Sequence, residues 1–474
     1  MDKRLDAVSA LVTGAVFASA ALASAQGPQV TPASPPPAPA APPSIAIENV
    51  TVIPMDRERV LRDHTVVVEG RRITAIGPSA STKVPDGATR IDGRGKFLLP
   101  GLTEMHAHFL GPQGIQAYGE PVADRFLYLN VAAGVTTVRG MIGGPRDLLV
   151  REEVARGVRV GPRIFTAGPS VNGTSVPDPR AARRTVTEQR AAGYDLLKIH
   201  PGVPRAAFDE VVRTAKAEGM PFAGHIPADV GLEHALASGI LTVEHLDGFV
   251  EVLQKDGTKL PADTGFFGSA IAGTVDEAKV PGLVAKVKAA GAWNTPTQVL
   301  LDNLYGGPSI DEVAARPEMQ YVPPALLAQW KTGAGQLGGP GFDPAAGRRF
   351  VELRRRLIRA LRDGGAGLVL GADAPQVFNV PGFATLRELE SMVAAGLTPY
   401  QALETGTRNP AIALGVPHSF GTVEEGRRAD LLLLDADPLA DIRNVWKRAG
   451  VVLAGRWFPA SELDAQLAGF AAAP

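Results

Sequence analysis

Short apolar runs alternate with helix-like stretches through the middle of the chain, from Phe97 to about Gly415. Besides the run that carries His106 and His108, the runs that resemble buried strands are Val135–Val138, Arg163–Ala167, Leu196–Ile199, Pro221–Ala223, Leu241–Val243, Ala292–Thr295 and Gly367–Leu370. Helical patterns lie between several of them, at Pro121–Ala133, Arg180–Ala192, Pro204–Glu218, Val230–Ala237, Val275–Ala290 and Arg348–Asp363. This alternation predicts an α/β fold with a parallel sheet, and eight such units predict a closed (β/α)8 TIM barrel.

An open, doubly wound sheet is the alternative architecture. Such a sheet would be expected to carry a glycine-rich dinucleotide turn between an early strand and its helix. The one match to that pattern is Gly333–Gly338, which lies late in the chain, in a glycine-rich loop with no strand just before it. We therefore interpret the match as chance and retain the barrel.

The two ends of the chain carry β-type patterns of a different kind. Near the N-terminus, partly alternating, β-branched segments occur at Ile45–Val52, Thr65–Glu69 and Arg72–Ile76, and near the C-terminus similar segments occur at Ala429–Leu434 and Gly450–Trp457. We predict that residues 45–96 and 416–460 form one composite β-sandwich that brackets a barrel of residues 97–415. Two unrelated β additions are the alternative.

The first 44 residues do not resemble either domain. Residues 1–25 have the pattern of a secretory signal peptide, with Lys3 and Arg4 before a small, apolar stretch and Ala23-Ser24-Ala25 as a cleavage site. Residues 26–44 are rich in proline and alanine and predict an extended linker. We expect a secreted or periplasmic protein without membrane attachment after cleavage; an uncleaved membrane anchor is the alternative.

Composition narrows the class of function. The chain has 474 residues and a formal net charge of -1, so nothing indicates binding to nucleic acid or to an anionic membrane surface. Cysteine is absent, which excludes disulfides, thiolate metal sites and a cysteine nucleophile. We expect a small molecule as the binding partner and leave a homo-oligomer open.

Polar side chains gather where the predicted strands end, which is where active sites of TIM barrels lie. In chain order, five strand ends supply His106 and His108, Lys198, His225, His245 and Asp373. Side chains two residues apart on a strand point the same way, so His106 and His108 can reach one point. Imidazole is a common ligand of zinc and related metals, so the pattern predicts a metal centre at this rim.

Each of these residues also has an ordinary structural interpretation. A single histidine such as His225 or His245 is commonly only hydrogen-bonded, and Asp373 could cap a helix or a turn. Lys198 lies in an apolar strand, where an ammonium group needs an anion or must lose its proton. His200 shares a strand face with Lys198, which makes it a candidate contact to a metal ligand or to substrate.

Taken in order, the segments GLTEMHAHF, LLKIH, GHIP, VEHLDG and LGADAP resemble the amidohydrolase superfamily. They look most like its secreted branch, similar to imidazolonepropionase and to metal-dependent Xaa-Pro dipeptidases. The resemblance covers about Ile45 to Trp457 and implies a (β/α)8 barrel with a centre of one or two metal ions and a flanking composite sandwich.

The resemblance also implies roles for the six candidate ligands. His106, His108 and Asp373 would bind a first divalent ion, His225 and His245 a second, and Lys198, carboxylated by carbon dioxide, would bridge the two. Zinc is the expected metal, with manganese or cobalt as alternatives. Asp373 would accept a proton from the attacking metal-bridging hydroxide and pass it to the leaving nitrogen. An unmodified Lys198 paired with Asp373 is the alternative.

Two segments depart from the pattern of the relatives. Arg139 is followed by Gly140, where relatives often have an acidic residue, and Pro169–Val176 replaces the Gly-Gly-His stretch typical of the dipeptidases. These departures place Xaa-Pro substrates in doubt. Long connections at Gly248–Asp276 and Asp302–Gly347 predict lids or substrate-binding loops, with a helical hairpin as the alternative.

The sequence thus predicts a metal-dependent hydrolase of amide bonds, peptide-like or N-acyl amino acid. The candidate substrate contacts are Arg139, Asn172, His200 and Tyr305. A lactone, ester or cyclic-amidine hydrolase of the same superfamily is the alternative, and a non-catalytic binding protein on the same fold is a third possibility. A complete ligand set that includes Asp373 argues against the binding protein, which has no need of a proton shuttle.

Overall fold

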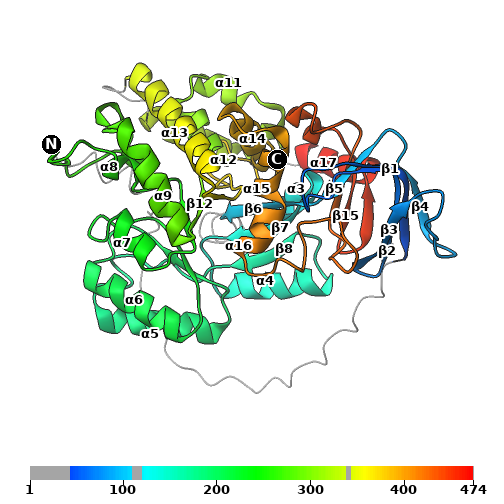
Figure 1. Ribbon diagram of the computed structural model, residues 1–474, viewed down its shortest axis with the longest axis horizontal. Helices are drawn as coiled ribbons and strands as arrows, with labels where there is room; N and C mark the ends of the chain where they lie inside the picture. The colour runs from blue at the N-terminus through cyan, green and yellow to red at the C-terminus, as the bar shows by residue number, and fades with distance from the viewer. Residues whose placement is uncertain (1–42, 109–119, 338–342, 473–474) are drawn as a thin grey trace.

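The computed structural model describes residues 43–108, 120–337 and 343–472. The predicted signal peptide and all but the last two residues of the predicted linker lie outside the described residues. Two regions are seen in Figure 1: a large α/β body, and a β domain in which blue strands from the start of the chain lie beside red strands from its end.

Eight short strands form the α/β body: β6 (Leu102–Ala107), β7 (Val135–Gly140), β8 (Arg163–Thr166), β9 (Leu197–Ile199), β10 (Phe222–Gly224), β11 (Thr242–Glu244), β12 (Trp293–Thr295) and β13 (Gly367–Leu368). All pair in parallel, β6–β8 in one sheet and β9–β13 in another. Backbone hydrogen bonds join the two sheets at both seams, from Asp195 N to Thr166 O and from Met105 N to Leu370 O. The fold is therefore α/β and consistent with the predicted TIM barrel.

Helices follow most of these strands. Those around the body are α3 (Glu120–Ala132), α4 (Pro145–Arg156), α5 (Pro179–Ala192), α6 (Arg205–Ala217), α7 (Leu232–Ala237), α9 (Val280–Ala290), α13 (Pro344–Gly364), α14 (Phe383–Ala394), α15 (Pro399–Gly406) and α16 (Arg408–Ala413). Each of the six helical patterns in the sequence corresponds to one of them. Helix α4 was not predicted, although Gly144-Pro145 at its start is a common helix N-terminus.

The two long connections contain short helices. Gly248–Asp276 holds α8 (Phe249–Val252) and the 3-10 turns η1 (Phe266–Gly268) and η2 (Ala272–Thr274), and η3 (Glu277–Lys279) follows it. Asp302–Gly347 holds the end of α10 (Gln298–Tyr305), then α11 (Ile310–Ala314), η4 (Pro317–Tyr321), α12 (Pro324–Leu337) and the first turn of α13. The described part of the second connection is therefore largely helical, whereas the first is mostly irregular between its short helical turns.

The β domain is one hydrogen-bonded sheet drawn from both ends of the chain. Its strands are β1 (Ile45–Val52), β2 (Leu61–Glu69), β3 (Arg72–Pro78), β4 (Thr89–Asp92), β5 (Phe97–Pro100), β14 (Leu431–Leu434), β15 (Arg448–Leu453) and β16 (Arg456–Pro459). The C-terminal strand β14 pairs with β5, which ties the two ends together. After β14 and β16 come η5 (Ile442–Trp446) and α17 (Ala460–Ala472). The predicted partnership of the two ends is thus present.

Two sequence-based boundaries need correction. Phe97–Pro100 was assigned to the barrel but pairs with β1 and β14 of the β domain, because Pro100-Gly101 interrupts the strand before β6 begins. Gly450–Trp457 was predicted as one strand but spans the β15–β16 hairpin. Gly455 turns it with a positive φ of 83°, and a Cβ there would lie 1.7 Å from the Gly70 carbonyl oxygen.

Two main apolar clusters are buried, and the larger one also includes residues of the β domain such as Leu99, Leu432 and Leu434. The larger cluster joins the strands of the body to the surrounding helices, and a smaller one lies within the β domain, where it includes Ile47, Val66, Leu98 and Leu433. A search of the described residues for a helix both long and apolar enough to span a bilayer finds none.

Candidate metal centre

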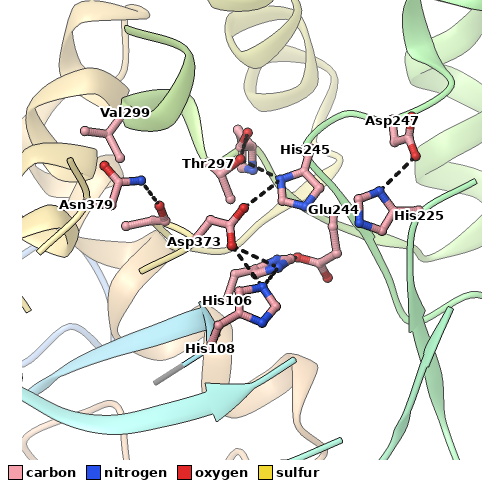
Figure 2. A network of polar contacts seen from close by, with 12 residues as sticks. His106, His108, His225, Glu244, His245, Asp247, Thr297, Val299, Asp373 and Asn379 are labelled. Carbon is pink, nitrogen blue, oxygen red and sulfur yellow. Dashed lines mark hydrogen bonds and ion pairs between the residues drawn. The ribbon is translucent and has the colours of Figure 1, made fainter. Parts of the chain in front are cut away.

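Potential metal ligands converge at the carboxyl ends of the first, sixth and eighth strands (Figure 2). His106 on β6, His245 after β11 and Asp373 after β13 are buried, and each offers one nitrogen or oxygen atom within 4.8 Å of the others. His108 joins them: its Nε2 lies 2.9 Å from Asp373 Oδ1 and 3.1 Å from His106 Nε2.

The remaining predicted ligands lie beside this group. Lys198 on β9 is fully buried, and its Nζ is 3.3 Å from His106 Nε2. His225 follows β10, and its ring centroid is 4.9 Å from that of His245. The structure therefore brings all six candidate ligands into one buried cluster at one end of the parallel strands.

A buried ion pair orients His106. The Nδ1–H group of His106 donates to Glu244 Oε2 at 2.6 Å, and the other carboxylate oxygen of Glu244 pairs with Arg139 Nη2 at 2.8 Å. All three side chains are fully buried. A carboxylate on one imidazole nitrogen fixes the proton there, so the lone pair of Nε2 points into the cluster.

A second buried carboxylate fastens β6 to the segment after β13. Glu104 accepts hydrogen bonds from the backbone N–H groups of His106 and Ala372 and from the hydroxyl of Thr385. Burial raises the pKa of Glu104 to about 8. Ala372 precedes Asp373, so Glu104 holds two ligand-bearing segments in register.

Different groups position the two histidines of β10 and β11. His225 Nδ1 lies 3.2 Å from Asp247 Oδ2, and His245 Nδ1 lies 2.8 Å from Thr297 Oγ1. Arg354 reaches in from α13 and donates to the carbonyl oxygens of His245 and Pro296, both at 2.6 Å. Arg354 is 1% exposed, so it anchors the backbone on which His245 lies from inside the protein.

The backbone is strained at two of the ligands. His245 and Asp373 have positive φ angles of 61° and 60°, a region that residues other than glycine rarely adopt. Such strain persists where surrounding contacts over-determine it and is common at functional sites. Next to Asp373, Gly371 allows β6 to approach: a Cβ there would lie 2.4 Å from Thr295 Cγ2 and 3.1 Å from the backbone nitrogen of His106.

Burial favours the neutral forms of the basic groups. Removal from water, with Lys198 close by, lowers the pKa of His106, His200 and His245 well below the ordinary value and also lowers that of His225. Burial lowers the pKa of Lys198 to about 8. Neutral imidazoles and a neutral amine are the forms that can coordinate a metal or react as nucleophiles.

The donor set fits a divalent cation. With its proton on Nδ1, His106 presents Nε2 as a lone pair 3.6 Å from Asp373 Oδ1, so two acceptors face each other. Asp373 Oδ1 makes no hydrogen bond of good geometry among the described residues, although His108 Nε2 lies 2.9 Å from it. Two ligands at roughly 2.0–2.2 Å from a tetrahedral zinc ion lie roughly 3.4 Å apart, close to the separation of these atoms.

The four candidate substrate contacts occupy different positions. Arg139 is fully buried below the rim, where its guanidinium donates to Glu244, Thr242 and the carbonyl oxygen of Met105, so its hydrogen-bond partners are protein groups and not a substrate site. Tyr305, at the end of α10, packs against Phe350 and hydrogen-bonds Ser269. The other two are closer to the cluster.

Of those two, His200 lies beside the ligands, with its ring centroid 5.2 Å from that of His225. Asn172 forms the turn that follows β8, and its side chain contacts Ser170, which in turn hydrogen-bonds His200.

Sequence reasoning missed several residues that support the ligands. They are Glu104, Glu244, Asp247, Thr297 and Arg354. Period-two spacing from His106 could have indicated Glu104, and Glu244 and Asp247 flank His245 in sequence. The ring of Phe267, in the long connection Gly248–Asp276, stacks on that of His245 at 4.5 Å and 14°.

Comparisons with known proteins agree with this geometry. An imidazolonepropionase from Ralstonia nicotianae is 26% identical over 392 residues, 81% of this chain and 88% of the relative. Among solved structures, a putative prolidase from Bifidobacterium longum superposes with a TM-score of 0.67 at 24% identity, covering 91% of this chain and 100% of that one. Bottromycin amidohydrolase gives a TM-score of 0.70 at 23% identity and covers 91% of both chains.

The sequence also matches the model of a protein family. The profile of the amidohydrolase family matches residues 97–458, which include the eight strands of the body and every candidate ligand. The protein is therefore a member of the amidohydrolase family.

Proposed function

We propose that this protein is a metal-dependent hydrolase that cleaves amide bonds in peptide-like or N-acyl amino acid substrates. The observation that carries the proposal is the buried Asp373 carboxylate, whose Oδ1 faces Nε2 of both His106 and His108, at 3.6 and 2.9 Å, without a hydrogen bond of good geometry among the described residues. If the cluster had only a structural role, these buried acceptors would destabilise the folded protein, because a buried acceptor without a partner costs free energy.

The residues present would hold two divalent ions, most simply zinc. His106, His108 and Asp373 would bind one ion, and His225 and His245 the other, with Lys198 between them. When bound, such ions lower the pKa of water and polarise a carbonyl group. The imidazole-rich donor set suits zinc.

Lys198 would contribute as a carbamate. Its buried amine, with a pKa of about 8, has an accessible neutral form whose nitrogen attacks the carbon of carbon dioxide. A C–N bond forms, one C–O π bond becomes a lone pair on oxygen, and the nitrogen releases a proton. The product is an anion with two oxygens, which replaces a buried ammonium by a group suited to bridging cations.

Asp373 would move the proton during hydrolysis. Its carboxylate lies at the centre of the cluster, within 2.9 Å of His108 Nε2, where a water attacking a substrate carbonyl would be placed. Asp373 accepts the proton that this water loses and delivers it to the nitrogen that departs. The strained backbone at Asp373 and the Glu104 bonds around it hold the carboxylate in place for both transfers.

We also propose that the two sheets of the body close into a (β/α)8 barrel and that the β domain is a sandwich. Hydrogen bonds at both seams support the barrel, and one apolar cluster shared by β1, β2, β5, β14 and β15 supports the sandwich. The names of the relatives favour a substrate with a cleavable C–N bond: an imidazolonepropionase and a prolidase are among them.

The test combines metal analysis with a substrate screen. Purified protein loaded with zinc is expected to retain two ions per chain and to hydrolyse at least one member of a panel of dipeptides, N-acyl amino acids and lactones. A chelator should abolish turnover, and added zinc should restore it. Asp373→Asn should remove turnover, whereas Asp464→Asn, at an exposed position of α17, should not. Hydrolysis that survives both chelation and Asp373→Asn would overturn the proposal.

A further inference from the structure

A short chain of hydrogen bonds begins at Asn172, in the turn after β8. Its Oδ1 accepts from the backbone N–H groups of Thr174 and Ser175, both at 2.9 Å. The oxygen and nitrogen of an asparagine side chain are assigned from their hydrogen-bond partners, and these two donors identify the atom that faces them as the oxygen. The NH2 group therefore points the other way, toward Ser170 Oγ at 3.0 Å.

The orientation of the Asn172 amide favours one direction for the hydrogen bond between Ser170 and His200. The Ser170 oxygen receives the amide hydrogen of Asn172 and leaves its own hydroxyl proton available for an acceptor. The other side-chain partner of Ser170 Oγ is His200 Nδ1, at 2.9 Å, which can accept that proton only if it carries none itself. In the neutral ring the proton then lies on Nε2.

The ring of His200 lies next to the candidate metal centre. His200 follows β9, two residues after Lys198, and its ring stands 5.2 Å from that of His225. His200 is 4% exposed, and the hydrogen bonds of its ring among the described residues involve Nδ1 rather than Nε2. Nε2 is not one of the fully enclosed polar atoms that lack a partner among the described residues, so its N–H remains available to a ligand that enters the site.

We propose that His200 Nε2–H donates a hydrogen bond to the scissile carbonyl oxygen of the substrate as that oxygen becomes an oxyanion, and that Asn172 and Ser170 are positioning residues that keep the proton on Nε2. The inference rests on the proposed function, since it assigns a donor to the reaction that the metal centre would support. An imidazolium ring would also carry a proton on Nε2, so the assignment of a donor holds in either charge state.

The proton position can be measured without a substrate. In 15N-labelled, zinc-loaded protein, the long-range correlations between ring nitrogens and ring carbon-bound hydrogens distinguish the two tautomers. His200→Phe identifies the His200 signals among the eight histidines of the chain. The wild-type protein is expected to show His200 with the proton on Nε2. A ring with its proton on Nδ1 would overturn the proposal.

Asn172→Asp gives the sharper test. The introduced carboxylate still accepts from Thr174 and Ser175 but offers Ser170 no hydrogen, so the Ser170 hydroxyl can donate to that carboxylate instead. His200 should then place its proton on Nδ1. Asn444→Asp, the same change in the β domain, should leave the His200 signals unchanged. Should Asn172→Asp fail to fold, Ser170→Ala replaces it and should yield a mixture of tautomers; an unchanged tautomer in the folded variant contradicts the relay.

The role of the donor is tested with a substrate from the screen above. His200→Phe should lower kcat by roughly 10²–10³-fold while KM changes little, because an oxyanion donor acts mainly in the transition state. Metal content should remain two ions per chain. A rise in KM without a fall in kcat would show a ground-state anchor and overturn the assignment. Failure of the metal or hydrolysis tests, with the tautomer as expected, would locate the error in the proposed function.

Discussion

The two groups of ligands differ in how their histidines are supported. The inner group consists of His106, His108 and Asp373, and the outer group of His225 and His245. His106 is held by Glu244, whose side chain is fully buried and paired with Arg139. His225 is held by Asp247, whose side chain keeps 16% of its surface exposed and pairs with no arginine or lysine within the described part of the chain.

This difference makes the inner group the more rigid of the two and the outer group the more accessible to solvent. A buried, paired carboxylate cannot relax without leaving a charge uncompensated, so the inner group is fixed in one geometry. A partly hydrated carboxylate can exchange its partner for water at small cost. We expect the inner group to retain its metal ion more tightly, and the outer group to be the one at which ions and substrates exchange.

Breaking the inner support should have the largest effect. Glu244→Gln removes the negative charge that compensates Arg139 and should reduce the free energy of unfolding by roughly 3–5 kcal/mol, because an unpaired charge remains buried. Denaturant unfolding followed by circular dichroism measures this change.

A double variant separates the charge effect from metal binding. Arg139→Met combined with Glu244→Met removes both charges and should recover much of the lost stability while leaving metal affinity low. A metal affinity equal to that of the wild type in the double variant would contradict the role assigned to Glu244.

Removing the anchor of His245 should be the next largest effect. Arg354→Met leaves the carbonyl oxygens of His245 and Pro296 without their buried donor and should cost roughly 2–3 kcal/mol of unfolding free energy. It should also weaken metal binding by the outer group, which a chelator competition assay detects as the earlier loss of one ion. Arg355→Met, at the neighbouring and partly exposed arginine, is the control and should not change the order of metal loss.

Asp247→Asn tests the outer support. The amide keeps the shape of the side chain but removes the charge that orients His225, so affinity for one of the two ions should fall by roughly 10–100-fold. Unfolding of the apoprotein should change little, since Asp247 is partly exposed. If the affinity for both ions fell equally, Asp247 would not act on the outer group alone, which would contradict this comparison.

Phe267→Leu should have the smallest effect on stability. Phe267 covers the faces of His245 and His225 at 4.5 and 5.9 Å but is partly exposed, so the unfolding free energy should change by roughly 1 kcal/mol or less. Its measurable consequence should be altered relative rates among substrates with small and aromatic side chains. Equal relative rates in both proteins would exclude Phe267 as a wall of the substrate pocket.

The candidate ligands at the strand ends could be predicted from the sequence, because their positions follow local rules. Period two places His106 and His108 on one face, and the βα pattern places Lys198, His225, His245 and Asp373 at the same end of the sheet. The side chains that position these ligands could not be predicted. Nothing in the sequence connects Arg354 with a carbonyl oxygen 109 positions earlier.

Arg139 illustrates a second limit. Its position at the end of an apolar run suggested a substrate contact, but it lies one residue before the end of β7 and points into the packed interior, where Glu244 meets it. A pattern of polar residues does not say whether a charge faces solvent, substrate or an opposite charge. That distinction depends on side chains brought together only by the fold.

The seam between the first and last strands of the body sets an order of events during synthesis. Met105 and His108 donate backbone hydrogen bonds to the carbonyl oxygens of Leu370 and Ala374, on either side of Asp373. A nascent chain that ends before this segment already carries all the histidines of the cluster and can pair β6 with β7, but it lacks Asp373 and the partner for the other edge of β6. We therefore expect the complete ligand set to form only after nearly four fifths of the polypeptide has been synthesised.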